Sequence, residues 1–180
     1  MSEVRGALSA DDVRMATERR LRREARERWT RLGIVAAVVL IADQIVKAII
    51  RGQLEVGEGW TVTGFLSILR VTNHGIAFGM FPGRQAYVAI ITVLALCAIA
   101  VFLARLVHRN LIAATGAGLL VGGSLGNLMD RLVHGGVTDY IDFSFWPTFN
   151  LADACITVGA VLIVWGLLQG DDEDDDAVGG

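Results

Sequence analysis

Four apolar stretches constrain the fold of this chain more than any other feature of its sequence. They cover about residues 32–50, 86–104, 111–129 and 153–169. A helix that crosses about 30 Å of hydrocarbon needs roughly 17–25 mostly apolar residues, so each stretch is long enough to span a membrane. The sequence therefore predicts one integral membrane domain, mainly α, with four transmembrane helices and no room for a second domain.

Basic residues are distributed unevenly around these stretches. Residues 1–31 hold nine Arg, and Arg105 and Arg109 lie in the short link between the second and third stretches. Lys and Arg collect on the cytoplasmic side of membrane proteins. Both termini are therefore expected in the cytoplasm, with loops 51–85 and 130–152 on the outer side.

The two ends of the chain differ in composition from its middle. Residues 12–31 are rich in Arg and in helix-forming residues, which predicts a solvated helix beside the membrane, with contact to anionic lipid or to a specific partner as further options. The other end carries the acidic run DDEDDD. We expect three parts: a cytoplasmic Arg-rich N-terminal extension over 1–31, a membrane domain over 32–169, and an acidic cytoplasmic tail over 170–180.

Two segments outside the apolar stretches have strand character. Residues 54–72 (LEVGEGWTVTGFLSILRVT) are rich in β-branched and aromatic residues and are interrupted by Gly, a pattern typical of a hairpin. Residues 137–143 (VTDYIDF) alternate in the manner of a short strand. These segments predict a small extracytoplasmic β-sheet. The segment NHGIAFGMFPG after the hairpin suits either a loop close to another backbone or a simple turn into the next span.

Acidic residues gather at the outer ends of the third and fourth stretches. Ionisable residues are costly at a membrane, so they indicate a functional site by default. Asp139 lies in the expected strand, with Asp142 on the opposite face. Asp153 lies near the first turn of the last helix, where a helix N-terminus stabilises an anion. Asn150, three residues earlier, is expected to help orient that carboxylate.

Asp139 and Asp153 are therefore predicted to form a water-activating pair. Two carboxylates that converge on one water cannot both ionise readily, so one keeps a proton while the other acts as a base. Aspartic peptidases use this arrangement. The sequence has no HExxH or Gly-x-Ser-x-Gly motif, and its three His are scattered. No metal site and no cofactor are expected.

Charged residues also occur in and beside the other spans. Asp43 and Lys47 lie one helical turn apart in the first stretch and can pair, and Lys47 is near enough to the outer end to extend toward the surface. Such an ion pair either neutralises its own two charges and only orients the helix, or supports a site on the outer side. Arg131 is the only basic residue of loop 130–152. It is expected to organise the site, because a guanidinium can bind a carboxylate or several carbonyls.

Glycines recur every four residues in the third stretch, at Gly118, Gly122 and Gly126. This spacing lets helix backbones approach closely in a membrane. Tight packing accounts for the glycines, but not for the polar residues that follow them at once, Asn127, Asp130 and Arg131.

Five short motifs occur in order along the chain: DQIVK (43–47), NHGIAFG (73–79), GNLMDR (126–131), GVTDYIDF (136–143) and FNLAD (149–153). In this order they resemble the lipoprotein signal peptidase (signal peptidase II) family. The resemblance covers most of the chain after residue 40. It implies a bacterial plasma membrane protein with four membrane helices and an active site near the outer face. The implied activity is that of an aspartic endopeptidase that removes signal peptides from diacylglyceryl-modified prolipoproteins, cleaving on the N-terminal side of the lipidated cysteine.

The resemblance also implies roles for individual residues. Asp139 and Asp153 match the catalytic pair. The positions that support the site or bind substrate match Asp43, Lys47, Asn73, Gly75, Asn127, Asp130, Arg131 and Asn150. The implied partners are lipidated prolipoproteins and membrane lipid. No nucleic acid partner is expected, and the protein is expected to be a monomer. The Arg-rich extension and the acidic tail fall outside the family core.

Two other functions fit parts of the sequence. Asp43 and Lys47 within a span suit a small proton- or cation-coupled transporter, although the acids gather on one side and no internal repeat is visible. A non-catalytic membrane scaffold, whose outer loop binds a partner, would keep the motifs without activity. Ion flux in liposomes that is lost on Asp43→Asn would favour the transporter. Cleavage of a lipidated precursor peptide would separate the peptidase from the scaffold.

Overall fold

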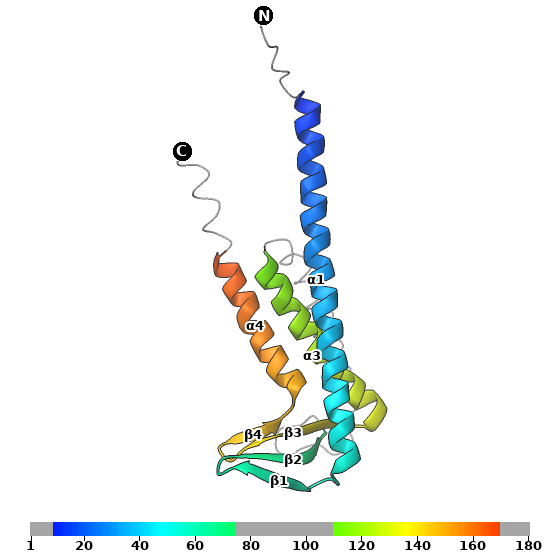
Figure 1. Cartoon of the computed structure of the whole chain (residues 1–180), viewed down its shortest axis with the longest axis vertical. Helices are drawn as coiled ribbons and strands as arrows, with labels where there is room; N and C mark the ends of the chain where they lie inside the picture. Colours follow the sequence, from blue (N-terminus) through cyan, green and yellow to red (C-terminus); the bar gives the residue numbers. More distant parts are fainter. Residues whose placement is uncertain (1–8, 75–109, 170–180) are drawn as a thin grey trace, which may run out of the picture.

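The computed structural model describes residues 9–74 and 110–169 (Figure 1). In this part of the chain, three helices stand side by side at one end of a four-stranded sheet. The helices are α1 (Ala10–Gln53), α3 (Leu111–His134) and α4 (Leu151–Gln169). The strands are β1 (Gly59–Thr63), β2 (Leu66–Asn73), β3 (Val137–Phe143) and β4 (Trp146–Phe149).

Each of these three helices is long and apolar enough to cross a membrane. They contain the predicted spans 32–50, 111–129 and 153–169, and the helical prediction for those stretches is confirmed. The predicted span 86–104 lies outside the described residues, so a total of four transmembrane helices stays a prediction.

The helix ends differ from the predicted ones. α1 is a continuous helix of 44 residues that starts at the capping residue Ser9, so the Arg-rich segment and the first span form one rod. At about 1.5 Å per residue this rod is about 66 Å long, twice the thickness of the hydrocarbon. α3 continues past residue 129 to His134, because Gly135 is the residue that adopts the left-handed cap conformation, with φ of 74°.

The sheet joins two hairpins in the antiparallel order β1-β2-β3-β4. The central pairing of β2 with β3 sets Val71 opposite Asp139, so the end of β2 lies beside the acidic strand. The small sheet and the strand at 137–143 are confirmed. β4 was not predicted: it has four residues and contains Pro147, which is tolerated there because β4 is an edge strand.

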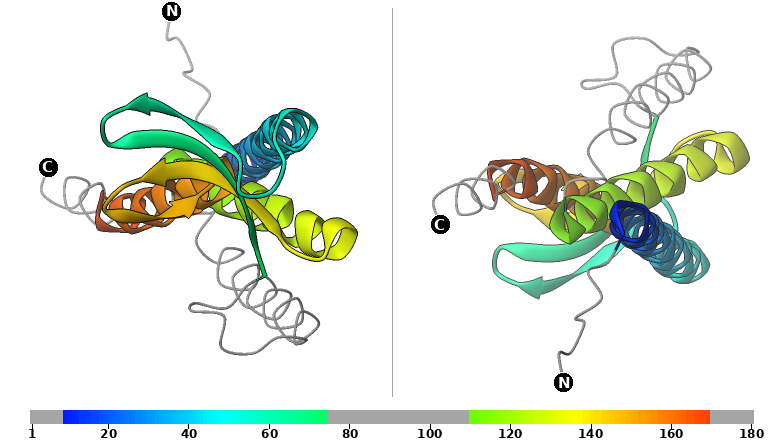
Figure 2. Two further views of the ribbon diagram at one scale, coloured as in Figure 1. Left: turned by 90° about the horizontal axis from the view of Figure 1, so that it is seen from below. Right: turned by 90° about the horizontal axis from the view of Figure 1, so that it is seen from above.

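Glycines bring α3 into close contact with both other helices. A Cβ atom at Gly122 would lie 2.6 Å from the carbonyl oxygen of Ala36 in α1, and one at Gly123 would lie 2.5 Å from that of Ala152 in α4. Gly118 and Gly126 face α1 in the same way, as their spacing predicted. The end-on views of Figure 2 show α3 between α1 and α4.

Gly122→Ala is expected to lower the free energy of unfolding by about 1–3 kcal/mol, because the backbone of α1 must move to admit the new methyl group. Thermal unfolding of the purified protein in detergent measures the change. Gly33→Ala in α1 is the matched control, since its added methyl group meets no atom of another described segment within 4 Å. Equal melting temperatures for the two variants would contradict this packing.

Candidate active site

Asp139 and Asp153 reach one site from different elements. Asp139 belongs to β3, where it is 2% exposed, and Asp153 lies in the first turn of α4. Asn150, which immediately precedes α4, contacts both. Its Nδ2 donates a hydrogen bond to Asp139 Oδ1 (2.6 Å), and its backbone N–H donates one to Asp153 Oδ2 (3.3 Å). The two acids thus lie on either side of one asparagine.

The start of α4 fixes the position of Asp153. The backbone N–H of Asp153 donates to Asn150 Oδ1 (3.0 Å), while the Asp153 carboxylate accepts from the backbone of Asn150. This reciprocal pair of bonds is a capping box, which ties the first turn to the residue before it. The predicted contact between Asn150 and Asp153 is therefore present. The hydroxyl of Tyr140, next to Asp139 in β3, accepts from the backbone N–H of Leu151 (3.1 Å).

Amide side chains from two further elements complete the contacts of the acids. Asn73 at the end of β2 donates from Nδ2 to Asp139 Oδ2 (2.9 Å). Asn127 of α3 donates from Nδ2 to Asp153 Oδ1 (2.7 Å). Neutral amides orient the carboxylates without neutralising them, which leaves both acids available for proton transfer.

Lys47 lies at the base of the site, fully buried. Its Nζ contacts Asp43 Oδ2 (2.9 Å), Asp130 Oδ2 (3.5 Å) and Asn127 Oδ1 (2.8 Å). The predicted pair of Asp43 with Lys47 is confirmed. The expected extension of Lys47 toward the surface is wrong, because its partners all lie inside the bundle. Through Asn127, the charge of Lys47 is linked to Asp153.

The two buried acids beside Lys47 hold the helices to the site. Asp43 Oδ1 accepts from the backbone N–H of Ala152 at the start of α4 (3.2 Å). Asp130 accepts from Arg51 Nη1 (3.2 Å) and from the backbone N–H of Thr138 in β3 (2.9 Å). The two acids therefore connect α1 and α3 to the elements that carry the predicted pair.

Sequence reasoning missed three residues of this network. Arg51 bonds both Asp130 and Thr138, and Gln44 donates to the carbonyl of Gly126 (3.1 Å). Arg51 lies four residues after Lys47, on the face of α1 that already carries Asp43 and Lys47. That spacing was a usable signal, whereas nothing local marks Thr138.

Arg131 and Gly75 stand apart from these contacts. Within the described residues, Arg131 donates to the carbonyl of Asn127 on its own helix (3.3 Å), forms no ion pair, and leaves its buried Nε without a partner. Arg131 was expected to bind a carboxylate or several carbonyls. Among these residues it binds one carbonyl, and Asp153 and Asp139 lie close enough to interact with its charge. Gly75 lies outside the described residues.

Burial changes the acidity of Asp139. Its removal from solvent, with the nearby charge of Asp153, raises the pKa of Asp139 to about 6, although hydrogen bonds from Asn73 and Asn150 oppose the rise. A buried carboxyl with a neighbouring acid is the environment in which one member of a pair retains a proton. Across residues 9–74 and 110–169, no three His, Cys, Asp or Glu side chains are grouped to hold a metal ion.

Comparison with known proteins identifies the family. Residues 35–169 match the model of the family described as signal peptidase (SPase) II. The chain belongs to the signal peptidase II family. It is 39% identical over 143 residues to a lipoprotein signal peptidase of Pelotomaculum thermopropionicum, covering 79% of this chain and 94% of that protein. It is 36% identical over 137 residues to that of Halothermothrix orenii, covering 76% and 94%.

A solved structure agrees with this assignment. A bacterial membrane enzyme determined at 2.3 Å is 34% identical, with a TM-score of 0.66 over 78% of this chain and 88% of that one. The resemblance seen in the five motifs is thereby confirmed, and the chain is a membrane peptidase of bacterial type. The family match begins at residue 35, after the Arg-rich extension.

Proposed function

We propose that this signal peptidase II family member removes signal peptides from prolipoproteins by aspartic-peptidase chemistry, with Asp139 and Asp153 as the catalytic pair. The relatives named lipoprotein signal peptidase support the substrate class. The observation that carries the chemistry is the double contact of Asn150, which holds carboxylates from β3 and α4 next to each other.

The environments of the two acids suggest their roles. Asp139, with its raised pKa, holds the proton, whereas Asp153 lies in the first turn of α4, where the helix N-terminus stabilises a negative charge.

In the proposed reaction, Asp153 takes a proton from a water between the two acids, and the water oxygen attacks the carbonyl carbon of the scissile peptide. Asp139 donates its proton to the carbonyl oxygen. As the tetrahedral intermediate collapses, the C–N bond breaks, Asp153 protonates the departing amine, and Asp139 recovers a proton from the intermediate.

The remaining predicted residues support this pair. Asn73, Asn127 and Asn150 orient the carboxylates, and Lys47 polarises Asn127 while being held by Asp43 and Asp130. We assign Arg131 to the substrate-facing side of the site. Gly75, which lies outside the described residues, keeps its predicted role as a residue that supports the site or binds substrate. The buried Nε of Arg131, unpartnered among the described residues, is available to a polar group of the substrate.

The proposed topology follows from the substrate. A diacylglyceryl-modified cysteine is held at the membrane surface by its acyl chains, so its signal peptide must be cut there. The site lies where α1, α3 and α4 meet the sheet (Figure 1), and we place this end of the helices at the outer face of the membrane. Both termini are then in the cytoplasm, and residues 86–104 form a fourth membrane helix. The protein would act as a monomer among membrane lipids and would need no cofactor or nucleic acid.

A direct assay tests this function. The purified protein is incubated with a precursor peptide that carries a diacylglyceryl group on its cysteine, and the products are identified by mass spectrometry. We expect one cut, on the N-terminal side of the lipidated cysteine, and little cleavage of the same peptide without lipid. An intact lipidated peptide would instead favour a transporter or a scaffold.

The pH dependence of kcat/KM reports on the pair, since this parameter follows the ionisation of the free enzyme. Asp139 binds its proton below its pKa of about 6 and loses it above, so kcat/KM is expected to fall roughly tenfold per pH unit on the alkaline side of that value. Asn73→Ala should move this limb to higher pH, because the lost hydrogen bond had lowered the pKa of Asp139. A flat profile, or an unmoved limb, would contradict the assignment.

A further inference from the structure

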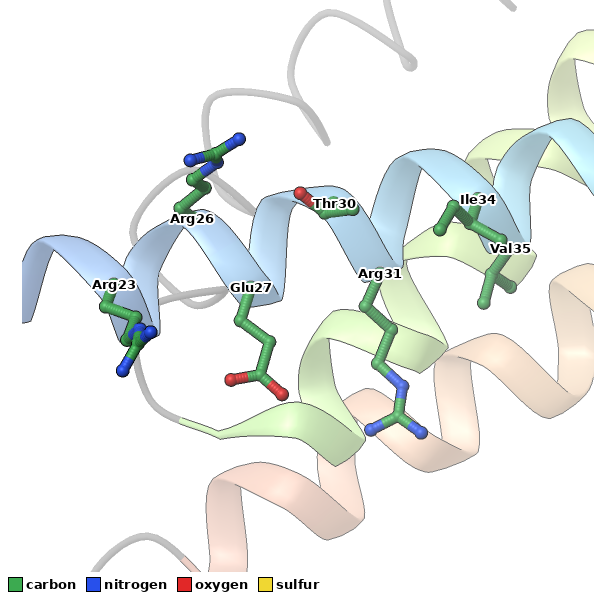
Figure 3. Close-up of a pocket in the computed structure, with 7 residues that line it drawn as sticks. All are labelled: Arg23, Arg26, Glu27, Thr30, Arg31, Ile34 and Val35. Atoms are coloured by element: carbon green, nitrogen blue, oxygen red, sulfur yellow. The ribbon is translucent and has the colours of Figure 1, made fainter.

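A groove of about 680 Å³ runs along α1 (Figure 3). It lies at the end of the bundle away from the sheet (Figure 1). The residues that line it include Arg23, Arg26, Glu27, Thr30, Arg31 and Ile34. Figure 3 shows Arg23, Glu27 and Arg31 on the side of α1 that faces α3 and α4. Most of the groove precedes residue 35, where the family match begins, so the family does not account for it.

The described residues that line the groove carry an excess of positive charge. Among them are three Arg and one Glu. Elsewhere on this helix, Glu24 pairs with Arg20 (2.8 Å) and Arg28 (3.7 Å). By contrast, Arg23 and Arg31 form no ion pair within the described part of the chain. Basic side chains directed into a concave surface attract an anionic segment.

The sequence places such a segment next to the groove. α4 runs away from the sheet and ends at Gln169, and six consecutive acids follow at positions 171–176. Leu32 of α1 and Leu167 of α4 pack against the same apolar cluster, formed by Ala114, Ala117, Leu120 and Ile163. The end of α4 is therefore level with Leu32, which is adjacent to Arg31.

The acidic segment is long enough to occupy the groove. Arg23 and Arg31 are separated by about 12 Å along the helix axis, at 1.5 Å per residue. The seven residues that follow Gln169 extend over at most about 25 Å. We propose that residues 171–176 dock in this groove and pair with Arg23 and Arg31. The tail then ties α4 directly to α1, two helices that otherwise meet mainly through α3 (Figure 2).

Disulfide cross-linking tests this docking. In a Cys97→Ser/Cys155→Ser background, Thr30→Cys with Asp174→Cys is expected to cross-link roughly tenfold faster than Met15→Cys with Asp174→Cys. Met15 is also exposed on α1, but it lies about 22 Å farther from the bundle. Both pairs are measured in full-length protein in phosphatidylcholine nanodiscs. Equal rates for the two pairs would overturn the proposal.

Charge reversal separates ionic docking from chance proximity. Arg23→Glu with Arg31→Glu should slow disulfide formation between Thr30→Cys and Asp174→Cys (the Thr30 cross-link) at least fivefold. Changing the remaining acids of 171–176 to Lys in that variant should restore the rate. Because the Debye length falls to about 3 Å at 1 M salt, high salt should also slow it. A rate that responds to neither change would refute the pairing.

Anionic lipid is the competing occupant of the groove. When phosphatidylglycerol replaces phosphatidylcholine, the Thr30 cross-link is expected to slow by less than about twofold, because a tethered segment has a high effective concentration. Complete loss of the cross-link in phosphatidylglycerol would assign the groove to lipid headgroups and overturn docking of the tail. Cross-linking does not depend on peptidase activity, so its outcome is independent of the proposed function.

Discussion

Asp139→Asn and Asp153→Asn are each expected to lower kcat/KM for a lipidated precursor peptide by about ten-thousandfold or more. Asn keeps the size of the side chain but cannot accept or release the proton that the proposed reaction transfers. Groups that act as a unit in catalysis lose activity on this scale when one member is removed. Initial cleavage rates of the purified variants measure the loss.

Asp142→Asn is the matched control for these variants. Asp142 lies in the same strand but accepts a hydrogen bond from Thr148 (2.9 Å), away from Asn150 and Asp153. This variant should keep at least about half of the activity, since it removes an acid that takes no part in the proposed proton transfers. Normal processing by either Asp139→Asn or Asp153→Asn would refute the catalytic pair.

Lys47→Met is expected to lower the free energy of unfolding by about 3–5 kcal/mol. Lys47 is fully buried between Asp43 and Asp130, and its loss leaves two carboxylates in the bundle without their shared cation. The variant should also cleave more slowly, because Asn127 loses the bond that fixes its contact with Asp153. Thermal unfolding in detergent and the kcat of the same preparation measure the two effects.

Arg20→Met provides a comparison at the surface. Arg20 and Glu24 have the same i,i+4 spacing and a similar distance, 2.8 Å, but the Arg20 side chain is 81% exposed. Breaking this exposed pair should change stability far less than the loss of Lys47 does, because solvent and salt screen the interaction of its charges. Asp43→Asn added to Lys47→Met should recover part of the loss, because it removes one unpaired carboxylate. Equal destabilisation by Lys47→Met and Arg20→Met would contradict the buried network.

Local pattern was sufficient for much of the fold. The apolar length of three helices and the alternation in residues 137–143 are properties of short segments, so the sequence alone predicts them. The end of α3 and the strand β4 were not predicted. The first depends on the left-handed conformation of Gly135, and the second is a four-residue edge strand that forms only because β3 is beside it.

The contacts of the site also fall into those that the sequence predicts and those that only the packing of the helices creates. The contacts of Asn150 with Asp153 and of Asp43 with Lys47 join residues within one helical turn, so their spacing predicts them. Lys47 and Asn127 are 80 residues apart in the sequence, and only the packing of α1 on α3 brings them together. For that reason the burial of Lys47 could not be predicted from its own helix, which instead indicated a side chain that extends toward the surface.

The proposed placement of Asp139 and Asp153 around one water can be tested in an experimental structure with a substrate mimic. A lipidated peptide with a hydroxyl group in place of the scissile carbonyl resembles the tetrahedral intermediate and cannot be cleaved. In its complex with the protein, we predict that the hydroxyl oxygen lies within about 3 Å of a carboxylate oxygen of each acid. A hydroxyl group bound by only one of them, with the other carboxylate directed elsewhere, would contradict the proposed mechanism.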